Sequence, residues 1–272
     1  MAFALGPQAA AAGFGLAAFD AIGSTNAEGL VRARNGEDGP LWLVTDRQTA
    51  GHGRRGRAWD SPAGNLAATL LRILSVPPAA AATLGFVAGL ALADALDAVG
   101  ARAAVALDGG RGAGRFALKW PNDLLADGAK LAGILLESEV QPDGRLAVVV
   151  GIGVNVVAAP EGLPYPATSL ARLGLEADAA SVFRYLSDAW VAREAQWDEG
   201  RGLPAIRDLW LARAAGLGQP IAVSQGGRVR RGIFRTLDDA GRLVIESDDG
   251  QQIAVAAGEV HFGAVATAGA AS

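Results

Sequence analysis

The chain has 272 residues, of which 51% are hydrophobic and 19% charged, with 24 Lys and Arg against 28 Asp and Glu. This apolar fraction excludes disorder for most of the chain, and the absence of cysteine excludes disulfides, thiolate metal sites and a cysteine nucleophile. Two histidines are too few for a histidine-built metal centre, and a net charge of −4 without a basic stripe argues against nucleic-acid binding.

Residues 1–18 are rich in Ala and Gly, and we expect them to form a loose leader. They lack the positively charged start of a signal or transit peptide. No apolar run reaches the roughly 18 residues of a membrane span without a Gly, Pro or charge. We therefore expect a cytoplasmic protein that has no membrane partner.

The first regular elements are a helix and two strands. The helix is predicted over 24–36, where Thr25 and Glu28 have the spacing of a capping box. Short β-rich runs at 41–45 and 66–74 predict strands on either side of a loop rich in Gly and Arg.

A second helix is predicted over 79–99, ending at Gly100. Turn signals, among them Gly109 to Gly114, then separate several strand-like runs, so this region should consist largely of antiparallel hairpins. The runs lie around Val105, at 116–120, at 131–139 and at 146–157. Helices at 179–198 and 203–215 follow.

After Gly216 the pattern changes to short alternating runs separated by Gly-rich turns, which predicts a small β-barrel. The fold class is therefore α/β (α+β), a mixed and largely antiparallel sheet with packed helices plus that barrel. The predicted units are a large domain over 19–216, a barrel domain over 217–266 and a tail over 267–272.

The loop at 51–65 begins with a GlyXGlyXXGly match at 51–56. A dinucleotide fingerprint needs a helix after its last Gly, whereas here Arg57, Trp59 and a Ser61-Pro62 step follow, so no Rossmann fold is predicted. Exposed backbone N–H groups and guanidinium groups suit a phosphate or a carboxylate. The alternative is a solvated, mobile surface loop.

Two further stretches carry candidate chemistry. The only two lysines, Lys119 and Lys130, flank a tight turn that contains Asp123, which suits a nucleotide with Mg²⁺ or, equally, a surface ion pair. Gly151 and Gly153 share one face of a strand and leave it flat, which suits a flat ligand or close packing of another element.

Taken together, these stretches resemble the biotin protein ligases over residues 20–262. The resemblance rests on SerThrAsn at 24–26, GlnThrAlaGlyHisGlyArgArgGlyArg at 48–57, LysTrpProAsnAsp at 119–123, LysLeuAlaGlyIleLeu at 130–135 and GlyIleGlyValAsn at 151–155. It implies a mixed α/β ligase domain, of the kind shared with lipoate ligases, and a C-terminal SH3-like barrel.

The resemblance also implies an activity and the residues that perform it. Family members activate biotin with MgATP to biotinyl-5′-AMP and transfer the biotinyl group to a lysine of a carrier domain. The implied catalytic residues are Lys130 and Arg54. The implied biotin-binding residues are Ser24, Thr25, Asn26, Gln48, Gly51, His52, Gly53, Arg54, Lys130, Gly151 and Gly153. The implied ATP-binding residues are Arg54, Arg55, Arg57, Trp59, Lys119, Asn122, Asp123, Lys130 and Asn155, with Asp123 also the candidate Mg²⁺ ligand.

The resemblance implies partners and one departure. The expected acceptor is the biotin carboxyl carrier domain of acetyl-CoA carboxylase or a related carboxylase, and a homodimer is left open. Because SerThrAsn begins at residue 24, no helix-turn-helix fits before it, and we expect a ligase without DNA binding. Members often carry arginine where this chain has His52, which makes any carboxylate contact there weaker or pH-dependent. The alternatives are a lipoate or octanoate ligase and an inactive biotin-binding paralogue.

Overall fold

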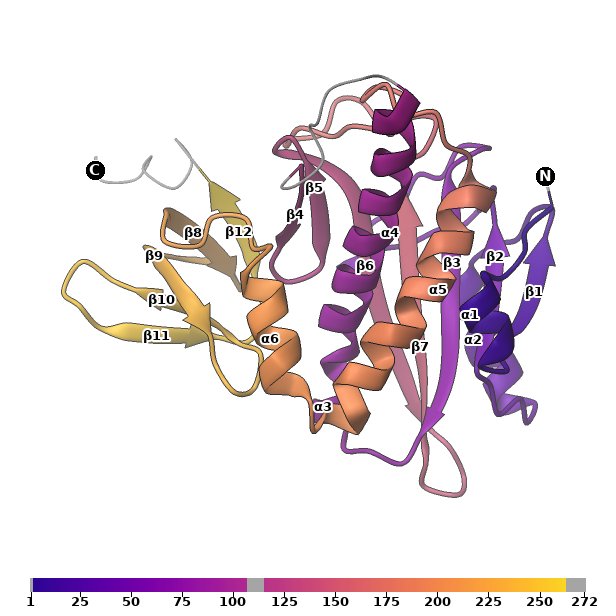
Figure 1. Ribbon diagram of the computed structural model, residues 1–272. Helices are drawn as coiled ribbons and strands as arrows, with labels where there is room; N and C mark the ends of the chain where they lie inside the picture. Colours follow the sequence, from indigo (N-terminus) through magenta and orange to yellow (C-terminus); the bar gives the residue numbers. More distant parts are fainter. Residues whose placement is uncertain (1, 107–114, 263–272) are drawn as a thin grey trace.

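The computed structural model describes residues 2–106 and 115–262, which form two sheets lying beside one another (Figure 1). The larger sheet is seven-stranded, in the order β1-β2-β3-β7-β6-β5-β4. Strands β1 and β2 pair in parallel, and the predicted antiparallel hairpins are confirmed in β4 to β7. The strands are β1 Gly15–Phe19, β2 Leu41–Thr45, β3 Leu66–Leu74, β4 Phe116–Lys119, β5 Asp123–Ala126, β6 Ala129–Val140 and β7 Leu146–Val154.

Strand β2 shows how the larger sheet buries both of its faces, since all five of its residues are buried. Successive side chains of a strand point to opposite faces. Trp42 and Val44 therefore join the main core, while Leu41 and Leu43 join a second cluster on the opposite face. Helix α2 (Thr25–Arg34) packs on that opposite face, against β3 and β7.

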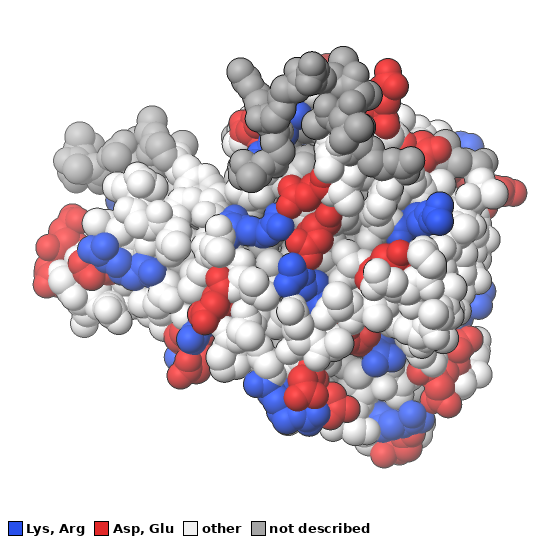
Figure 2. All heavy atoms as spheres, in the orientation of Figure 1, with Lys and Arg blue, Asp and Glu red and all other residues white. Residues whose placement is uncertain are grey.

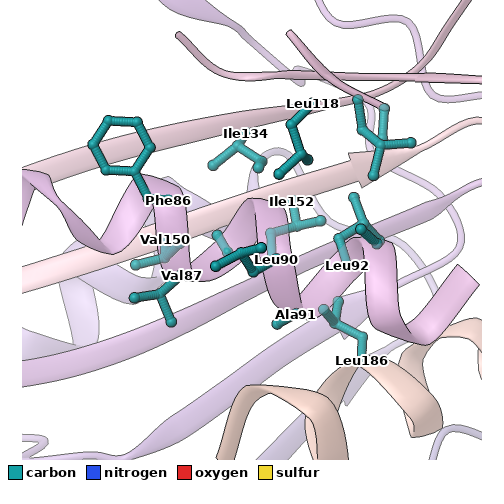
Figure 3. Packing of buried hydrophobic residues seen from close by; sticks show 14 of the residues in the cluster. Phe86, Val87, Leu90, Ala91, Leu92, Leu118, Ile134, Val150, Ile152 and Leu186 are labelled. Carbon is teal, nitrogen blue, oxygen red and sulfur yellow. The ribbon is translucent and has the colours of Figure 1, made fainter. Parts of the chain in front are cut away.

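Two long helices, α4 (Leu84–Ala106) and α5 (Ala179–Trp197), cover the main-core face of the sheet (Figure 1). Val87 and Leu90 of α4 lie against Val150 and Ile152 of β7 (Figure 3). The stretch 78–101 is long and apolar enough to span a membrane by length and composition, yet 67% of its apolar 18-residue window is buried inside the protein. It is therefore the core helix of this domain, as its packing between sheet and α5 indicates.

Charged side chains tie these helices together on the outside of the molecule. Arg193 of α5 lies 2.6 Å from Asp94 of α4, and Arg213 lies 2.9 Å from Asp94 and 2.7 Å from Asp97. Figure 2 shows basic and acidic side chains adjacent to one another over this face. The remaining helical segments are α1 Pro7–Ala11, α3 Pro78–Ala82, α6 Leu203–Leu211 and the 3₁₀ turns η1 Arg54–Gly56 and η2 Asp198–Gly200.

The second sheet is antiparallel and five-stranded, in the order β11-β10-β9-β8-β12. Four of its strands follow the predicted alternating runs, and β12 is an additional one. Ile221, Val223 and Phe234 of this sheet belong to the same buried cluster as the core of the larger sheet, so the two units share apolar packing. The strands are β8 Pro220–Gln225, β9 Arg228–Leu237, β10 Leu243–Glu246, β11 Gln252–Val255 and β12 Glu259–Phe262.

The N-terminal segment differs from the loose leader that its composition predicts. Helix α1 is capped by Asp188 of α5, whose Oδ1 accepts hydrogen bonds from the backbone nitrogens of Gln8 (2.8 Å) and Ala9 (3.0 Å). Strand β1 then pairs in parallel with β2. The prediction was wrong because both contacts are made to distant parts of the chain, which composition cannot reveal.

Two helix boundaries also differ from the prediction. The N-cap of α2 is Ser24 and not Thr25, and Glu28 pairs with Arg32 at 2.9 Å instead of closing a capping box. Helix α4 continues through Gly100, so the region around Val105 is helical and not a strand. Packing against α5 and the sheet overrides the weak helix propensity of one glycine. The predicted turn at 109–114 lies outside the described residues.

Candidate active site

A cavity of about 750 Å³ opens on the α2 side of the larger sheet, at the N-terminal end of that helix. The loop at 51–59, the turn at 119–123 and strand β12 of the second sheet form its walls. Most of the residues predicted for the site therefore face one space. Those lining the cavity are Ser24, Thr25, Asn26, Gln48, His52, Gly53, Arg54, Arg55, Arg57, Trp59, Lys119, Asn122, Asp123, Lys130, Gly151 and Gly153.

Two predicted residues do not line the cavity. The Gly51 carbonyl accepts a hydrogen bond from the Trp59 nitrogen at 3.0 Å, which places Gly51 in the small hairpin of the loop, behind the wall. Asn155 is 2% exposed, and its Nδ2 donates to the Thr168 carbonyl at 3.1 Å. Its amide therefore holds the end of β7 against the following segment instead of facing the predicted nucleotide side.

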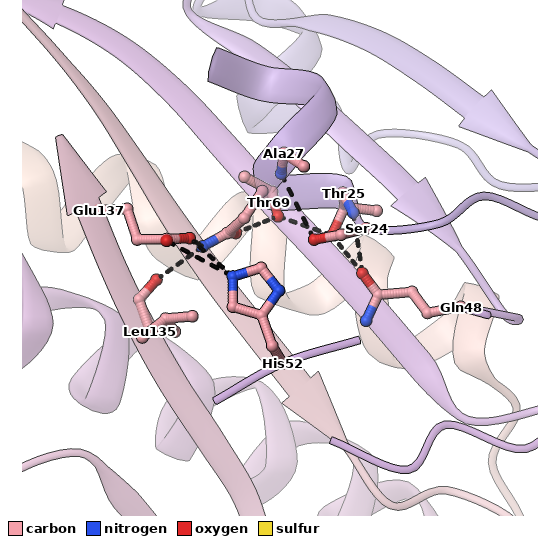
Figure 4. A network of polar contacts seen from close by, with 9 residues as sticks. Ser24, Thr25, Ala27, Gln48, His52, Thr69, Leu135 and Glu137 are labelled. Atoms are coloured by element: carbon pink, nitrogen blue, oxygen red, sulfur yellow. Dashed lines mark hydrogen bonds and ion pairs between the residues drawn. The ribbon is translucent and has the colours of Figure 1, made fainter. Parts of the chain in front are cut away.

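One end of the cavity is built from hydroxyl and amide groups at the start of α2 (Figure 4). Thr25 donates two hydrogen bonds to Gln48 Oε1, from its backbone nitrogen at 2.8 Å and from its hydroxyl at 3.0 Å. Thr69 Oγ1 lies 2.7 Å from both Thr25 Oγ1 and Asn26 Oδ1. Because Thr69 has one hydroxyl hydrogen, it can donate to only one of them at a time.

The same network extends to the rim of the cavity through Glu137 of β6 (Figure 4). Asn26 Nδ2 donates to Glu137 Oε2 at 2.8 Å and to the Leu135 carbonyl at 3.2 Å. His52 Nε2 lies 3.3 Å from Glu137 Oε2. Glu137 thus connects a buried amide of α2 to the Gly/Arg loop, a link that the sequence did not indicate.

Gly151 and Gly153 lie in the floor of the cavity, and the space above them is filled by other side chains, which is the close packing that the sequence left open as an alternative to a flat ligand. A Cβ on Gly151 would lie 2.3 Å from Asn26 Oδ1, and one on Gly153 would lie 2.5 Å from Trp59 Nε1. Gly133 pairs with Gly153 across the two strands and would place a Cβ 3.1 Å from the Trp59 ring. The indole of Trp59 therefore lies over a floor that no larger residue could form.

The other end of the cavity is charged. Lys130 Nζ lies 2.6 Å from Asp123 Oδ1, and both side chains are largely buried. Arg54 donates to Asn122 Oδ1 at 3.1 Å and to the Gly258 carbonyl at 3.4 Å. Arg54, from the loop, and Lys130, from β6, therefore reach the same cavity.

The cations at the charged end lose solvent on burial, and the nearby carboxylates compensate for that loss only in part. Desolvation lowers the pKa of Arg54, and the neighbouring Arg55 lowers it further. Desolvation also lowers the pKa of Lys119, whose ammonium lies 5.4 Å from the centre of the Phe262 ring. The carboxylates of Asp123 and Glu259 oppose both shifts, and Asp123 also pairs with Lys130, so two acids face the larger number of cations at this end. Such an excess of positive charge attracts anions.

Strand β12 supplies a wall that the sequence did not predict. The Glu259 carboxylate forms an ion pair with the Arg57 guanidinium of the loop, and this hydrogen bond lowers the pKa of Glu259. Residues 258–262 all line the cavity. The four residues of β12 include one acid and one histidine but no turn residue and no motif. The sequence alone therefore did not indicate this wall, and only the pairing of β12 with β8 reveals it.

A second missed wall is the segment at 163–166, which also lines the cavity. Its backbone is tied to that of the predicted catalytic lysine, since Lys130 N donates to the Pro166 carbonyl at 2.8 Å. Tyr165 is 39% exposed, and its ring centre lies 5.6 Å from Lys130 Nζ. An exposed aromatic residue between two prolines was the available sequence signal.

The mixed sheet and a cavity lined by several cations are what a ligase of the biotin and lipoate type would need, and the family models show that class. The model of the biotin/lipoate A/B protein ligase family matches residues 19–155, and that of the biotin protein ligase C-terminal domain matches 216–263. A biotin–[acetyl-CoA-carboxylase] ligase of Paracoccus denitrificans is 43% identical over 88% of this chain and 97% of its own length. This chain belongs to the biotin protein ligase family.

Other relatives extend this result. A biotin–[acetyl-CoA-carboxylase] ligase of Mycobacterium tuberculosis is 38% identical over 93% of this chain and 92% of its own length. The bifunctional ligase/repressor BirA of Escherichia coli is 30% identical over 87% of this chain, and the match spans 70% of that protein. The biotin protein ligase from Aquifex aeolicus in complex with biotin and ATP has the same fold, with a TM-score of 0.71 and 24% identity over 91% of this chain and 98% of that one.

Proposed function

We propose that this protein activates biotin with ATP and transfers it to a lysine of the biotin carboxyl carrier domain of acetyl-CoA carboxylase. The observation that carries the proposal is the placement of Arg54 and Lys130 in one cavity, next to a neutral polar end lined by Thr25 and Gln48. A carboxylate and a triphosphate repel each other, and cations positioned in advance reduce that repulsion. The protein is inferred to work in the cytoplasm.

The first half-reaction joins the two anions. A carboxylate oxygen of biotin forms a bond to the α-phosphorus of ATP, the bond from that phosphorus to the bridging oxygen breaks, and pyrophosphate leaves with the electron pair. Lys130 and Arg54 are proposed to contact the oxygens on which negative charge increases. Fixed donors that face developing charge in a buried site are typically the largest single contribution to catalysis.

The second half-reaction uses the product of the first, the mixed anhydride biotinyl-5′-AMP. The amine of the acceptor lysine attacks the acyl carbon, the bond from that carbon to the AMP oxygen breaks, and an amide and AMP result while the amine proton is lost to solvent. The cavity has one wall in each sheet. An acceptor must therefore present its lysine at an opening that both units border.

The neutral end is proposed to hold the ureido ring of biotin. That ring is uncharged and both donates and accepts hydrogen bonds, so hydroxyl and amide partners suit it. Gln48 Oε1 already accepts from Thr25, which leaves the Gln48 amide nitrogen to donate to a ligand. Ser24, Asn26 and Gly53 complete this proposed subsite, and the loop residue His52 borders it.

The charged end is proposed to hold ATP. Arg55, Arg57 and Lys119 face the cavity there, and Trp59 offers an indole face for the adenine. Within the described residues no group of three or more His, Cys, Asp or Glu could hold a metal ion. Asp123 is a single carboxylate, which fits Mg²⁺ that arrives on the phosphates and takes one protein ligand. Mg²⁺ would neutralise phosphate charge.

The competing functions are a lipoate or octanoate ligase and an inactive biotin-binding paralogue. The decisive experiment incubates the protein with ATP, Mg²⁺ and either biotin or lipoate, and identifies the acyl-adenylate by mass spectrometry. Biotinyl-5′-AMP alone is the expected product. Lipoyl-AMP would establish the first alternative, and biotin binding without any adenylate would establish the second.

A further inference from the structure

The ammonium group of Lys130 lies between one carboxylate and two aromatic rings. Asp123 Oδ1 is 2.6 Å from Nζ, and the ring centres of Trp59 and Tyr165 are each 5.6 Å from it. Both rings are within the distance at which an aromatic face attracts a cation. Asp123 belongs to a stretch that resembles the family, whereas Trp59 and Tyr165 both lie outside those stretches.

The three neighbours act on the ammonium in different ways. An ammonium has three N–H donors, and among the described residues Asp123 offers the one acceptor at hydrogen-bond distance. An aromatic face attracts the charge without supplying a lone pair of comparable strength. Lys130 is therefore held by charge while two of its donors stay available for the oxygens of an anionic ligand.

The backbone fixes Tyr165 relative to Lys130. Lys130 N donates to the Pro166 carbonyl at 2.8 Å, and Thr168 N donates to the Lys130 carbonyl at 2.9 Å. Pro164 and Pro166 flank the tyrosine and restrict its backbone. The ring and the ammonium therefore belong to one small paired unit, and a movement of the segment would carry both.

The position of Tyr165 has no explanation in core packing. Its side chain is 39% exposed at the cavity, although a tyrosine that served only stability would bury its ring. If the Tyr165 ring were absent, one of the two aromatic attractions on the ammonium would be lost, and the lysine would settle further into its ion pair with Asp123. The Lys130–Asp123 ion pair, which would have to break during adenylation, would then be stronger.

We propose that Tyr165 is a positioning residue that, with Trp59, forms an aromatic cage around Lys130 and holds its ammonium toward the reacting anions. This inference rests on the proposed role of Lys130. The contribution comes from the ring face, not from the phenolic hydroxyl. Loss of the ring should therefore slow adenylation more than it weakens the binding of biotin.

The test compares Tyr165→Leu with Tyr165→Phe in the whole protein. The measured quantities are the single-turnover rate of biotinyl-5′-AMP formation and the KM values for biotin and ATP. Tyr165→Leu should lower the rate about tenfold, the size of one cation–π contact between a largely buried ammonium and a partly exposed ring, while the KM for biotin changes less than twofold. Tyr165→Phe should stay within about threefold of the unaltered protein.

Controls separate this inference from the function on which it rests. Val157→Ala removes an exposed apolar side chain of the same connecting segment outside the cavity and should not alter the rate. Thermal melting shows whether Tyr165→Leu is folded. An unchanged rate in Tyr165→Leu, or an equal loss in Tyr165→Phe, would overturn the cage while Lys130→Ala still tests the proposed mechanism. Full activity of Lys130→Ala would overturn the mechanism itself.

Discussion

The two ends of the cavity differ in how far their polar groups are already satisfied. At the end formed by α2, Thr25, Asn26, Gln48 and Thr69 bond to one another and leave a few defined donors and acceptors. At the opposite end, a larger number of cations share the two carboxylates of Asp123 and Glu259. The first arrangement selects a neutral ring by geometry, and the second attracts anions by charge.

Lys130→Ala gives the largest expected effect, because it removes charge from the second end without touching the first. The rate of adenylation should fall about a hundredfold or more, since a donor aimed at developing charge is lost. Biotin affinity measured by calorimetry should change much less. Equal losses of rate and of biotin affinity would show that the two ends are not functionally separate.

Thr69→Val disturbs only the neutral end. The side chain is fully buried, valine has nearly the same shape, and the hydroxyl that serves Thr25 and Asn26 is removed. Leaving buried partners unsatisfied costs about 1–3 kcal/mol, so the KM for biotin should rise about tenfold. The KM for ATP serves as the internal control. A rise in the KM for ATP alone would show that biotin does not bind at the neutral end.

Glu259→Gln tests the wall that β12 contributes to the charged end. The Arg57 guanidinium loses its ion pair, and the loop loses one link to the second sheet. Exposed pairs of this kind are typically worth under about 1 kcal/mol, so the KM for ATP should change by no more than about fivefold. Limited proteolysis within residues 51–65 should become faster. Unaltered cleavage would show that the pair does not hold the loop.

Lys119→Met tests whether a buried charge at the cationic end of the cavity lowers the stability of the protein. Burial lowers the pKa of Lys119 from 10.5 in the folded protein, so between the lowered value and 10.5 the unfolded chain binds more protons and stability rises with pH. Below that window the cost of the buried charge is fully present. Methionine removes this cost, so the melting temperature at neutral pH should rise by about 2 °C while ATP binding weakens. A lower melting temperature would contradict it.

Local patterns predicted those parts of the site that a single strand or turn encodes. Gly151 and Gly153 indicated a flat face because side chains alternate along a strand, and that face forms the cavity floor. Lys119 and Lys130 were singled out by their rarity, and both ammonium groups reach the cavity. In each case the information lies within a few residues.

The features that were missed depend on contacts between distant segments. Helix α1 needs Asp188, and β12 needs β8 as its partner, so neither has a sufficient local pattern. Asn155 was assigned to the nucleotide because it belongs to the GlyIleGlyValAsn stretch that resembles the family, yet its amide bonds to Thr168 beneath the surface. The sequence showed that Asn155 lies at the end of a strand. It did not show that the Asn155 amide would bond to the Thr168 carbonyl and not face the cavity.

Residues 258–262 follow every other residue that lines the cavity in the order of the chain. During translation the ribosome therefore synthesises the cationic groups of the pocket well before the strand that encloses them. Until that late strand has been made, a nascent polypeptide lacks the wall that stands beside Arg54 and Lys130. A frameshift shortly before Gly258 would accordingly yield a product with the reactive cations but without the wall beside them.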